Sequence, residues 1–189
     1  SVESQQVETL HRVRESVSIP LSVKLSPFYT NPLTIISRMD GEKVDGFVLF
    51  NRLLQPDINV SEEKNVFPFN LSEPTANRLP LRFAGLLFGE IQGSICASSG
   101  IFTGQDVAKM ILAGADCVQV VSTLYRNGTD HIQSILNDLE EWMKNKGYEQ
   151  LSDFRGTMSR RNTKNPWTYT RAQYVRLLLT ENPLDWKKP

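Results

Sequence analysis

The chain has 189 residues, and its 21 Lys and Arg residues are balanced by 21 Asp and Glu residues, so the formal net charge is zero. This balance gives no electrostatic argument for nucleic acid or a membrane surface as a partner. Hydrophobic residues make up 40% of the chain, which suits a folded core, and no apolar run reaches the length of a membrane span. The opening residues SVESQQVETLHRVRES lack the pattern of a signal peptide, so we expect one domain in the cytoplasm.

The first third of the chain predicts a helix followed by two strand–helix units. The helical pattern covers residues 2–16, and a second helix over residues 31–40 has Asn31 as its cap and Pro32 in its first turn. Strands are predicted at residues 21–25 and 46–51. The second of these, GFVLFN, shows no polar alternation, which is typical of a strand covered on both faces in a parallel sheet.

The middle of the chain, residues 53–77, is irregular and contains three prolines, with a short strand predicted around Phe67. Strand and helix patterns then alternate again. Helices are predicted at residues 79–93, 103–114 and 129–146, and strands at 94–98 and 116–121. Thr103 and Asp106 are spaced as a capping box. Alternating strands and helices predict an α/β fold with a parallel sheet of about five strands.

Polar and small residues gather where the predicted strands end. Lys24, Asn51, Ser98-Ser99-Gly100 and Ser122-Thr123 occupy these positions. Ligands of parallel α/β folds bind at this edge, where small residues let an anion approach backbone N–H groups. Serine and glycine are also ordinary turn residues, and a strand-end lysine can simply reach water. Two such ends, one strand–helix unit apart, favour a phosphate site.

The two cysteines and two histidines suggest no metal site. Cys96 and Cys117 fall inside predicted buried strands, where a free cysteine behaves as a small hydrophobic residue, and we expect no disulfide. His11 and His131 lie on predicted helices, where we expect them to be exposed. The spacing of these four residues does not match a zinc site.

Several motifs resemble one family in the same order and spacing. The stretch SSGIFTGQDVAKMILAGADCVQVVSTLYRNG resembles the C-terminal part of the dihydroorotate dehydrogenases, especially the soluble class that uses flavin mononucleotide (FMN). PLSVKLSPFY and LEEWMKNKGYEQLSDFRGTM also look like this family, so the resemblance runs from about residue 20 to residue 158. It implies the C-terminal part of a (β/α)₈ TIM barrel over residues 1–158. Residues 159–189 are then a C-terminal extension with a short helix at RAQYVRLLL.

The resemblance also implies roles for individual residues. Ser98, Ser99, Gly100, Ser122 and Thr123 stand where the family holds the flavin phosphate. Lys24 matches a lysine beside the flavin ring, where a cation favours the anionic reduced flavin. Asn51 matches an asparagine that hydrogen-bonds a pyrimidine substrate, and Arg52 lies beside it.

Two departures from the family pattern affect this interpretation. Ser99 replaces a glycine, so we expect the backbone there to avoid positive φ. Arg52 replaces a small hydroxyl residue. Its guanidinium either grips a substrate carboxylate or pairs with Asp57 or a glutamate of the long loop, and the sequence leaves both open.

A full barrel takes about 250 residues and eight strands, more than this chain offers. The resemblance implies that the general base, a Cys or Ser after the third strand, lies upstream of Ser1. Unpaired sheet edges then predict association, as a homo-oligomer or with the missing half of the barrel. The favoured function is an FMN-dependent oxidoreductase acting on a dihydropyrimidine-like substrate. The alternatives are a non-catalytic scaffold or assembly piece and another phosphate-binding barrel enzyme.

Overall fold

Four parallel strands form the central sheet of the computed structural model, which describes residues 1–53, 55–68 and 71–170. The strand order is β1-β2-β5-β6, and each neighbouring pair is parallel. The strands are β1 (Ser22–Leu25), β2 (Gly46–Leu49), β5 (Ser94–Ser98) and β6 (Cys117–Gln119). These strands confirm the α/β class and four of the five predicted positions.

The two faces of the sheet differ because successive side chains of a strand point to opposite sides. The helix-covered face carries a row in register across the sheet: Leu25, Leu49, Ala97 and Val118. The opposite face, here called the inner face, carries the preceding row: Lys24, Val48, Cys96 and Cys117. Leu25, Leu49 and Ala97 are buried, whereas Lys24 and Cys117 are exposed. The hydrophobic core therefore lies between the sheet and its helices.

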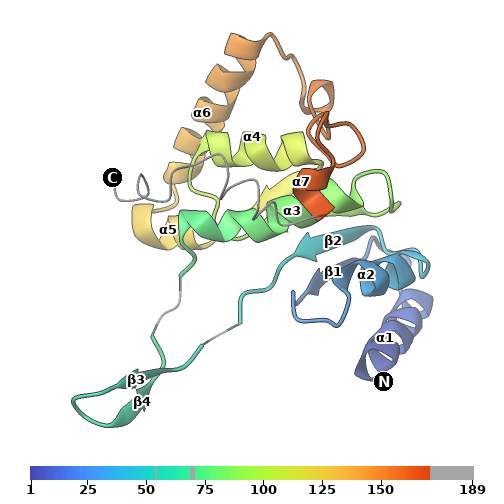
Figure 1. The fold of residues 1–189 in the computed structure, drawn as a ribbon, viewed down its shortest axis with the longest axis vertical. Helices are drawn as coiled ribbons and strands as arrows, with labels where there is room; N and C mark the ends of the chain where they lie inside the picture. Colours follow the sequence, from blue (N-terminus) through green and yellow to red (C-terminus); the bar gives the residue numbers. More distant parts are fainter. Residues whose placement is uncertain (54, 69–70, 171–189) are drawn as a thin grey trace.

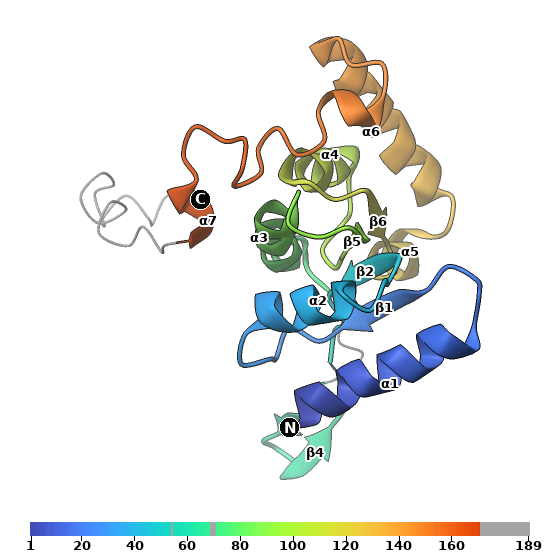
Figure 2. The ribbon, with the colours of Figure 1, turned by 90° about the vertical axis from the view of Figure 1, so that its right-hand side faces the viewer.

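Helices pack around the strands in chain order. They are α1 (Val2–Ser16), α2 (Pro32–Asp40), α3 (Arg78–Leu87), α4 (Gly104–Ala113), α5 (Ser122–Asn127) and α6 (His131–Lys146). α3 contacts β5, α4 contacts β6, α6 packs on α4, and α1 packs on α2 (Figure 2). Phe47, Ile36 and Met110 are fully buried where sheet and helices meet.

Two helix starts that the sequence predicts are confirmed by their caps. The Asn31 side chain accepts the N–H of Leu33 at 3.1 Å, and Pro32 is the first residue of α2. At α4, Thr103 Oγ1 accepts the Asp106 N–H at 3.2 Å while Asp106 Oδ2 accepts the Thr103 N–H at 3.2 Å. Both caps satisfy N–H groups that have no partner within the helix.

Other boundaries differ from the prediction where glycine interrupts a helical pattern. α3 ends at Leu87 instead of residue 93, shortly before Gly89 with φ +74°. β6 ends at Gln119, and Ser122 begins the separate short helix α5. Gly128, with φ +81°, divides α5 from α6. Glycine adopts these angles at no steric cost. Gly89 follows the end of α3, where the predicted helix continues to residue 93, and Gly128 ends α5, a helix that the sequence did not predict.

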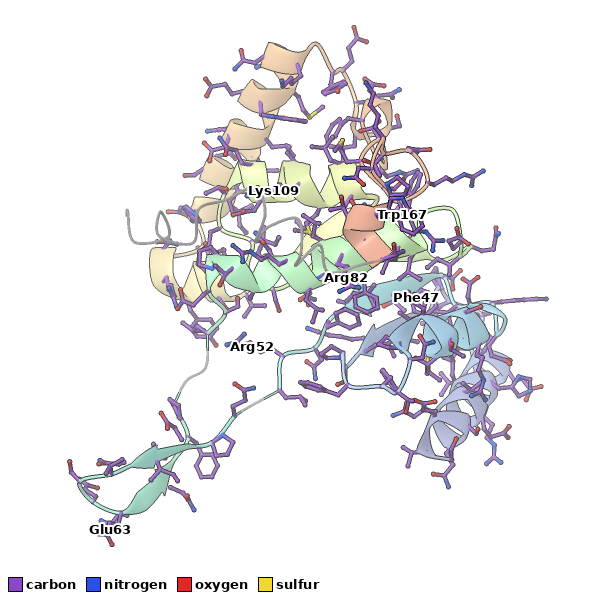
Figure 3. All side chains as sticks on the ribbon, viewed as in Figure 1. Phe47, Arg52, Glu63, Arg82, Lys109 and Trp167 are labelled. Carbon is purple, nitrogen blue, oxygen red and sulfur yellow. The ribbon has the colours of Figure 1, made fainter. Side chains whose placement is uncertain are left out.

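The fifth parallel strand predicted around Phe67 is wrong. In its place β3 (Asp57–Asn59) and β4 (Lys64–Val66) form an antiparallel hairpin that stands away from the main sheet (Figure 1). Glu63, with φ +50°, lies in its turn and is labelled at the tip in Figure 3. Two strands joined by a short turn pair antiparallel, because a parallel pair needs a crossover of a dozen residues or more.

The described end of the chain packs on α3. The Tyr169 ring of α7 (Trp167–Thr170) lies against Gly85, where an added Cβ would meet the ring at 2.1 Å. A 3₁₀ turn, η2 (Leu151–Asp153), precedes the fully buried Phe154, which contacts the rings of Trp142 and Tyr148. The helix predicted at RAQYVRLLL lies outside the described residues.

Among the described residues, no helix combines the length and apolar character needed to cross a membrane.

Candidate functional site

A cavity of about 370 Å³ lies beyond the C-terminal ends of the four parallel strands. This volume falls within the range of small-molecule sites. Seven of the eight residues predicted from the sequence line it: Lys24, Asn51, Arg52, Ser98, Ser99, Gly100 and Ser122. These residues come from four segments that are far apart in the chain, and the parallel sheet brings them to one edge.

The turn after β5 has an unusual backbone. Ser99 has φ +91° and Gly100 has φ +72°. The expectation that Ser99 avoids positive φ is therefore wrong: the turn keeps the left-handed backbone that the family's glycine provides and imposes it on a serine. Such angles cost a non-glycine residue on the order of 1 kcal/mol or more.

Gly100 is confined by the neighbouring 3₁₀ turn η1 (Pro74–Asn77). A Cβ at Gly100 would lie 2.4 Å from the Asn77 backbone nitrogen and 2.9 Å from the Pro74 carbonyl oxygen. Asn77 is itself fixed, because its side-chain amide donates to Asp106 Oδ1 at 3.0 Å. The backbone at residue 100 therefore has room only for glycine.

Three hydroxyl and amide groups meet at Ser72, which is 5% exposed. Its Oγ accepts the Gly100 N–H at 3.2 Å and donates to Ser122 Oγ at 2.9 Å, and the Ser72 N–H donates to the same Ser122 oxygen at 2.8 Å. Sequence reasoning missed Ser72, which lies in the irregular segment 53–77. No local pattern marks it, because its role depends on contacts 28 and 50 residues away.

A second polar cluster lies on the inner face. Lys24 Nζ donates to Gln119 Oε1 at 2.7 Å, and Ser98 Oγ donates to the same oxygen at 3.2 Å. β1 and β6 are three strand spacings apart, about 14 Å in a flat sheet, so this contact indicates that the inner face is concave. Gln119 was also missed. Gln119 could have been found in the same way as Lys24, because each is a polar residue within an apolar strand.

Asn51 and Arg52 follow β2 instead of ending it, and both are exposed. They line this cavity and an adjoining one of about 330 Å³, which Arg78 also lines. Arg52 lies on the segment that joins β2 to the hairpin (Figure 3). The Arg126 guanidinium, hydrogen-bonded to Glu73, lowers the pKa of that carboxyl, and the charge of Arg52 lowers it further.

Thr123 is the one predicted residue that does not line the cavity. Its side chain is fully buried, and its hydroxyl accepts the Asn127 side-chain amide at 3.1 Å. Thr123 therefore holds α5 together at its first turn.

The expected burial of the cysteines and exposure of His131 need correction. Cys117 is exposed and Cys96 is half-buried, because both point to the inner face and not to the helices. His131 is partly buried, and its ring contacts the Phe102 carbonyl oxygen at 2.9 Å. Among the described residues, no three His, Cys, Asp or Glu side chains are grouped as a metal site.

The fold and this cavity define an α/β protein with a polar cavity at the C-terminal edge of a parallel sheet. Its sequence from residue 2 to residue 143 matches the family model described as dihydroorotate dehydrogenase. The chain belongs to the dihydroorotate dehydrogenase family.

Similar proteins agree with this assignment. The chain is 25% identical over 156 residues to the catalytic subunit of dihydroorotate dehydrogenase B (NAD(+)) from Thermoplasma acidophilum, a match covering 81% of this chain and 51% of that protein. It is 41% identical over 86 residues to a probable dihydroorotate dehydrogenase A (fumarate) from Streptococcus pneumoniae, covering 46% of this chain and 27% of that protein.

A solved structure supports the fold. Dihydroorotate dehydrogenase from Eimeria tenella, crystallised with ferulenol, superposes with a TM-score of 0.57 at 22% identity, covering 72% of this chain and 37% of that one. The chain thus spans about half the length, or less, of the family members it matches.

Proposed function

We propose that the cavity binds the phosphate end of FMN and that this chain is the phosphate-binding half of a dihydroorotate dehydrogenase-type oxidoreductase. The observation that carries the proposal is the position of Ser72 Oγ. One oxygen atom there accepts the Gly100 N–H and contacts the Ser122 hydroxyl. A phosphate oxygen in place of this hydroxyl would accept the Gly100 N–H and, with the Ser122 hydroxyl turned to donate, a second hydrogen bond, and hydrogen bonds to a charged acceptor are the stronger kind.

The donors around the cavity fit a phosphate ester. The Gly100 N–H, which now donates to Ser72 Oγ, is one backbone donor, and Ser98, Ser99 and Ser122 are hydroxyl residues that line the same cavity. Bound FMN would supply a two-electron acceptor for a hydride. The chain's own contribution is Lys24, which also lines the cavity and whose ammonium would stabilise negative charge on the ring.

The substrate end of the proposal rests on Asn51 and Arg52. A side-chain amide beside a guanidinium suits a planar, dihydropyrimidine-like ring that carries a carboxylate, because arginine pairs with a carboxylate through two parallel hydrogen bonds. Both residues line the cavity that contains Lys24. We assign the general base to the part of the family's barrel that this chain does not span, so the chain alone would bind without turning over.

A ligand titration tests the proposal. FMN, riboflavin and inorganic phosphate would each be titrated into the full chain, with flavin fluorescence and calorimetry as readouts. We expect FMN to bind at least tenfold more tightly than riboflavin, because riboflavin lacks the charged acceptor that gains hydrogen bonds worth about 1.5–3 kcal/mol each.

The same titration separates the alternatives. Equal affinities for FMN and riboflavin would contradict phosphate recognition. No flavin binding with saturable phosphate binding would favour another phosphate-binding barrel enzyme, and binding of none of the three would favour a scaffold.

A further inference from the structure

We propose that Cys96 and Cys117 form a redox-active dithiol on the inner face of the sheet, which a hydroperoxide converts to an intramolecular disulfide. The two residues are directly in register on the neighbouring parallel strands β5 and β6. They therefore point to the same side of the sheet. This inference is independent of the proposed flavin site.

The spacing of the two strands permits the bond. Neighbouring strands lie about 4.7–4.9 Å apart, and disulfides join Cα atoms about 4.4–6.8 Å apart whose Cβ bonds do not diverge. Paired residues on parallel strands meet the Cα condition, and the bond closes when their Cβ atoms, about one strand spacing apart, approach to about 3.5–4.5 Å. Cys96, 21 residues away in sequence, is thus held next to Cys117 as a resolving partner.

The two thiols differ in their surroundings, and this difference makes Cys117 the cysteine that is oxidised first and Cys96 the resolving cysteine. Cys117 is exposed and Cys96 is half-buried, so an oxidant reaches Cys117 first. The neighbouring Cys96 thiol lowers the pKa of Cys117 to about 7, while the neighbouring Cys117 and burial raise the pKa of Cys96.

Two charged groups act on this pair. The Asp116 carboxylate, which is next to Cys117 and paired with Arg155, raises the pKa of Cys117 because it repels the thiolate. The Lys24 ammonium lowers the pKa of Cys96 because it attracts the thiolate. A low-pKa, exposed thiol beside a resolving cysteine is the arrangement that peroxide-sensitive sites use.

The chemistry balances with a hydroperoxide as the two-electron oxidant. The Cys117 thiolate attacks one peroxide oxygen, the O–O bond breaks, and the departing oxygen takes up a proton, leaving a sulfenic acid on Cys117. The Cys96 sulfur then attacks the Cys117 sulfur, a disulfide forms, and the sulfenic oxygen leaves as water with the Cys96 proton. Two thiols and one hydrogen peroxide give one disulfide and two waters.

The bond would tie two strands that both carry cavity residues. Ser98 follows Cys96 by two positions and Gln119 follows Cys117 by two, on the same face. Oxidation would therefore fix the separation of β5 and β6 just below the cluster of Lys24, Ser98 and Gln119.

The test treats the full chain with one equivalent of hydrogen peroxide under nitrogen and maps the products by mass spectrometry of the intact and digested protein. We expect the loss of two hydrogen atoms, a peptide pair linked through Cys96 and Cys117, and recovery of both thiols on reduction. Over-oxidation of Cys117 to sulfinic acid, or disulfides only between chains, with no linked pair within a chain, would overturn the proposal.

Two single-cysteine variants test the separate roles of Cys96 and Cys117. In Cys96→Ala, the sulfenic acid on Cys117 should persist and react with dimedone, and alkylation of Cys117 at pH 7 should slow about tenfold as its pKa returns toward the ordinary value near 8.5. In Cys117→Ala, oxidation of Cys96 should be slow. Unchanged alkylation of Cys117 in Cys96→Ala would contradict the pairing even if the chain folds.

Discussion

Gly100 shows at the scale of one residue how the site depends on backbone geometry. Its N–H reaches the Ser72 hydroxyl only because residue 100 lies against η1 with φ +72°. The sequence marked SSG as a candidate phosphate turn, since small residues after a strand suit an anion site. The positive φ of Ser99 could not be predicted in this way, and the packing of the adjacent Gly100 against residues 74–77 is a distant contact that no local pattern reveals.

We expect Gly100→Ala to lower the free energy of unfolding by about 2–4 kcal/mol, from the left-handed strain plus the clash with the Asn77 backbone. The control is Gly147→Ala, since Gly147 has φ +75° but nothing within 4 Å of an added Cβ. That variant should lose only about 1 kcal/mol. Urea denaturation of both variants measures the difference, and equal losses would show that the turn at Gly100 is not tightly packed.

At the scale of the elements, the capping box of α4 links helix formation to the site. Asp106 is buried, accepts N–H groups from Phe102 and Thr103, and receives the Asn77 amide that positions η1 beside Gly100. The sequence predicted this cap because its spacing is local. The contact with Asn77, 29 residues away, could not be predicted from the same pattern.

We expect Thr103→Ala to lower the free energy of unfolding by about 1 kcal/mol, and Asp106→Ala to lower it by about 3 kcal/mol because it also leaves the buried Asn77 amide unpaired. Lys109→Ala is the control: its ammonium pairs with Asp106 at 3.2 Å but is half-exposed, so the loss should stay below about 0.5 kcal/mol. Thermal and urea unfolding give the ranking. A Lys109 effect as large as that of Asp106 would mean that the ion pair, not the cap, stabilises the turn.

The sequence predicted where the helices and strands lie along the chain better than it predicted which segments contact one another. α1, α2, α4 and the four parallel strands followed from periodicity and caps, which are local properties. The hairpin was missed because its residues, DIN and KNV, lack an apolar face, and a short strand carries too few positions to show its direction.

For the whole molecule, the inner face and the two outer edges of the sheet determine whether the chain is expected to associate with another chain. Parallel sheets are ordinarily covered on both faces, and unpaired edges invite strand pairing. Here Ser22, Lys24, Ser94 and Cys117 of the inner face are exposed, and within the described residues no strand pairs with the outer edge of β1 or β6. We propose that a second copy or the remaining half of a family barrel pairs with these edges.

The purified chain should therefore sediment as a dimer or larger species at micromolar concentration and dissociate on dilution. Its β1 and β6 amides should exchange with solvent faster in the dilute sample. A monomer at all concentrations, with equal exchange at both, would contradict association through the sheet.

The proposed recognition of the FMN phosphate by Gly100 and Ser122 is tested most directly by comparing the binding of FMN and riboflavin in the wild-type chain and in Ser122→Ala. We expect the variant to bind FMN about tenfold more weakly and riboflavin unchanged, while Ser134→Ala, on the exposed surface of α6, alters neither. An equal loss for both flavins, or no loss for FMN, would contradict the claim.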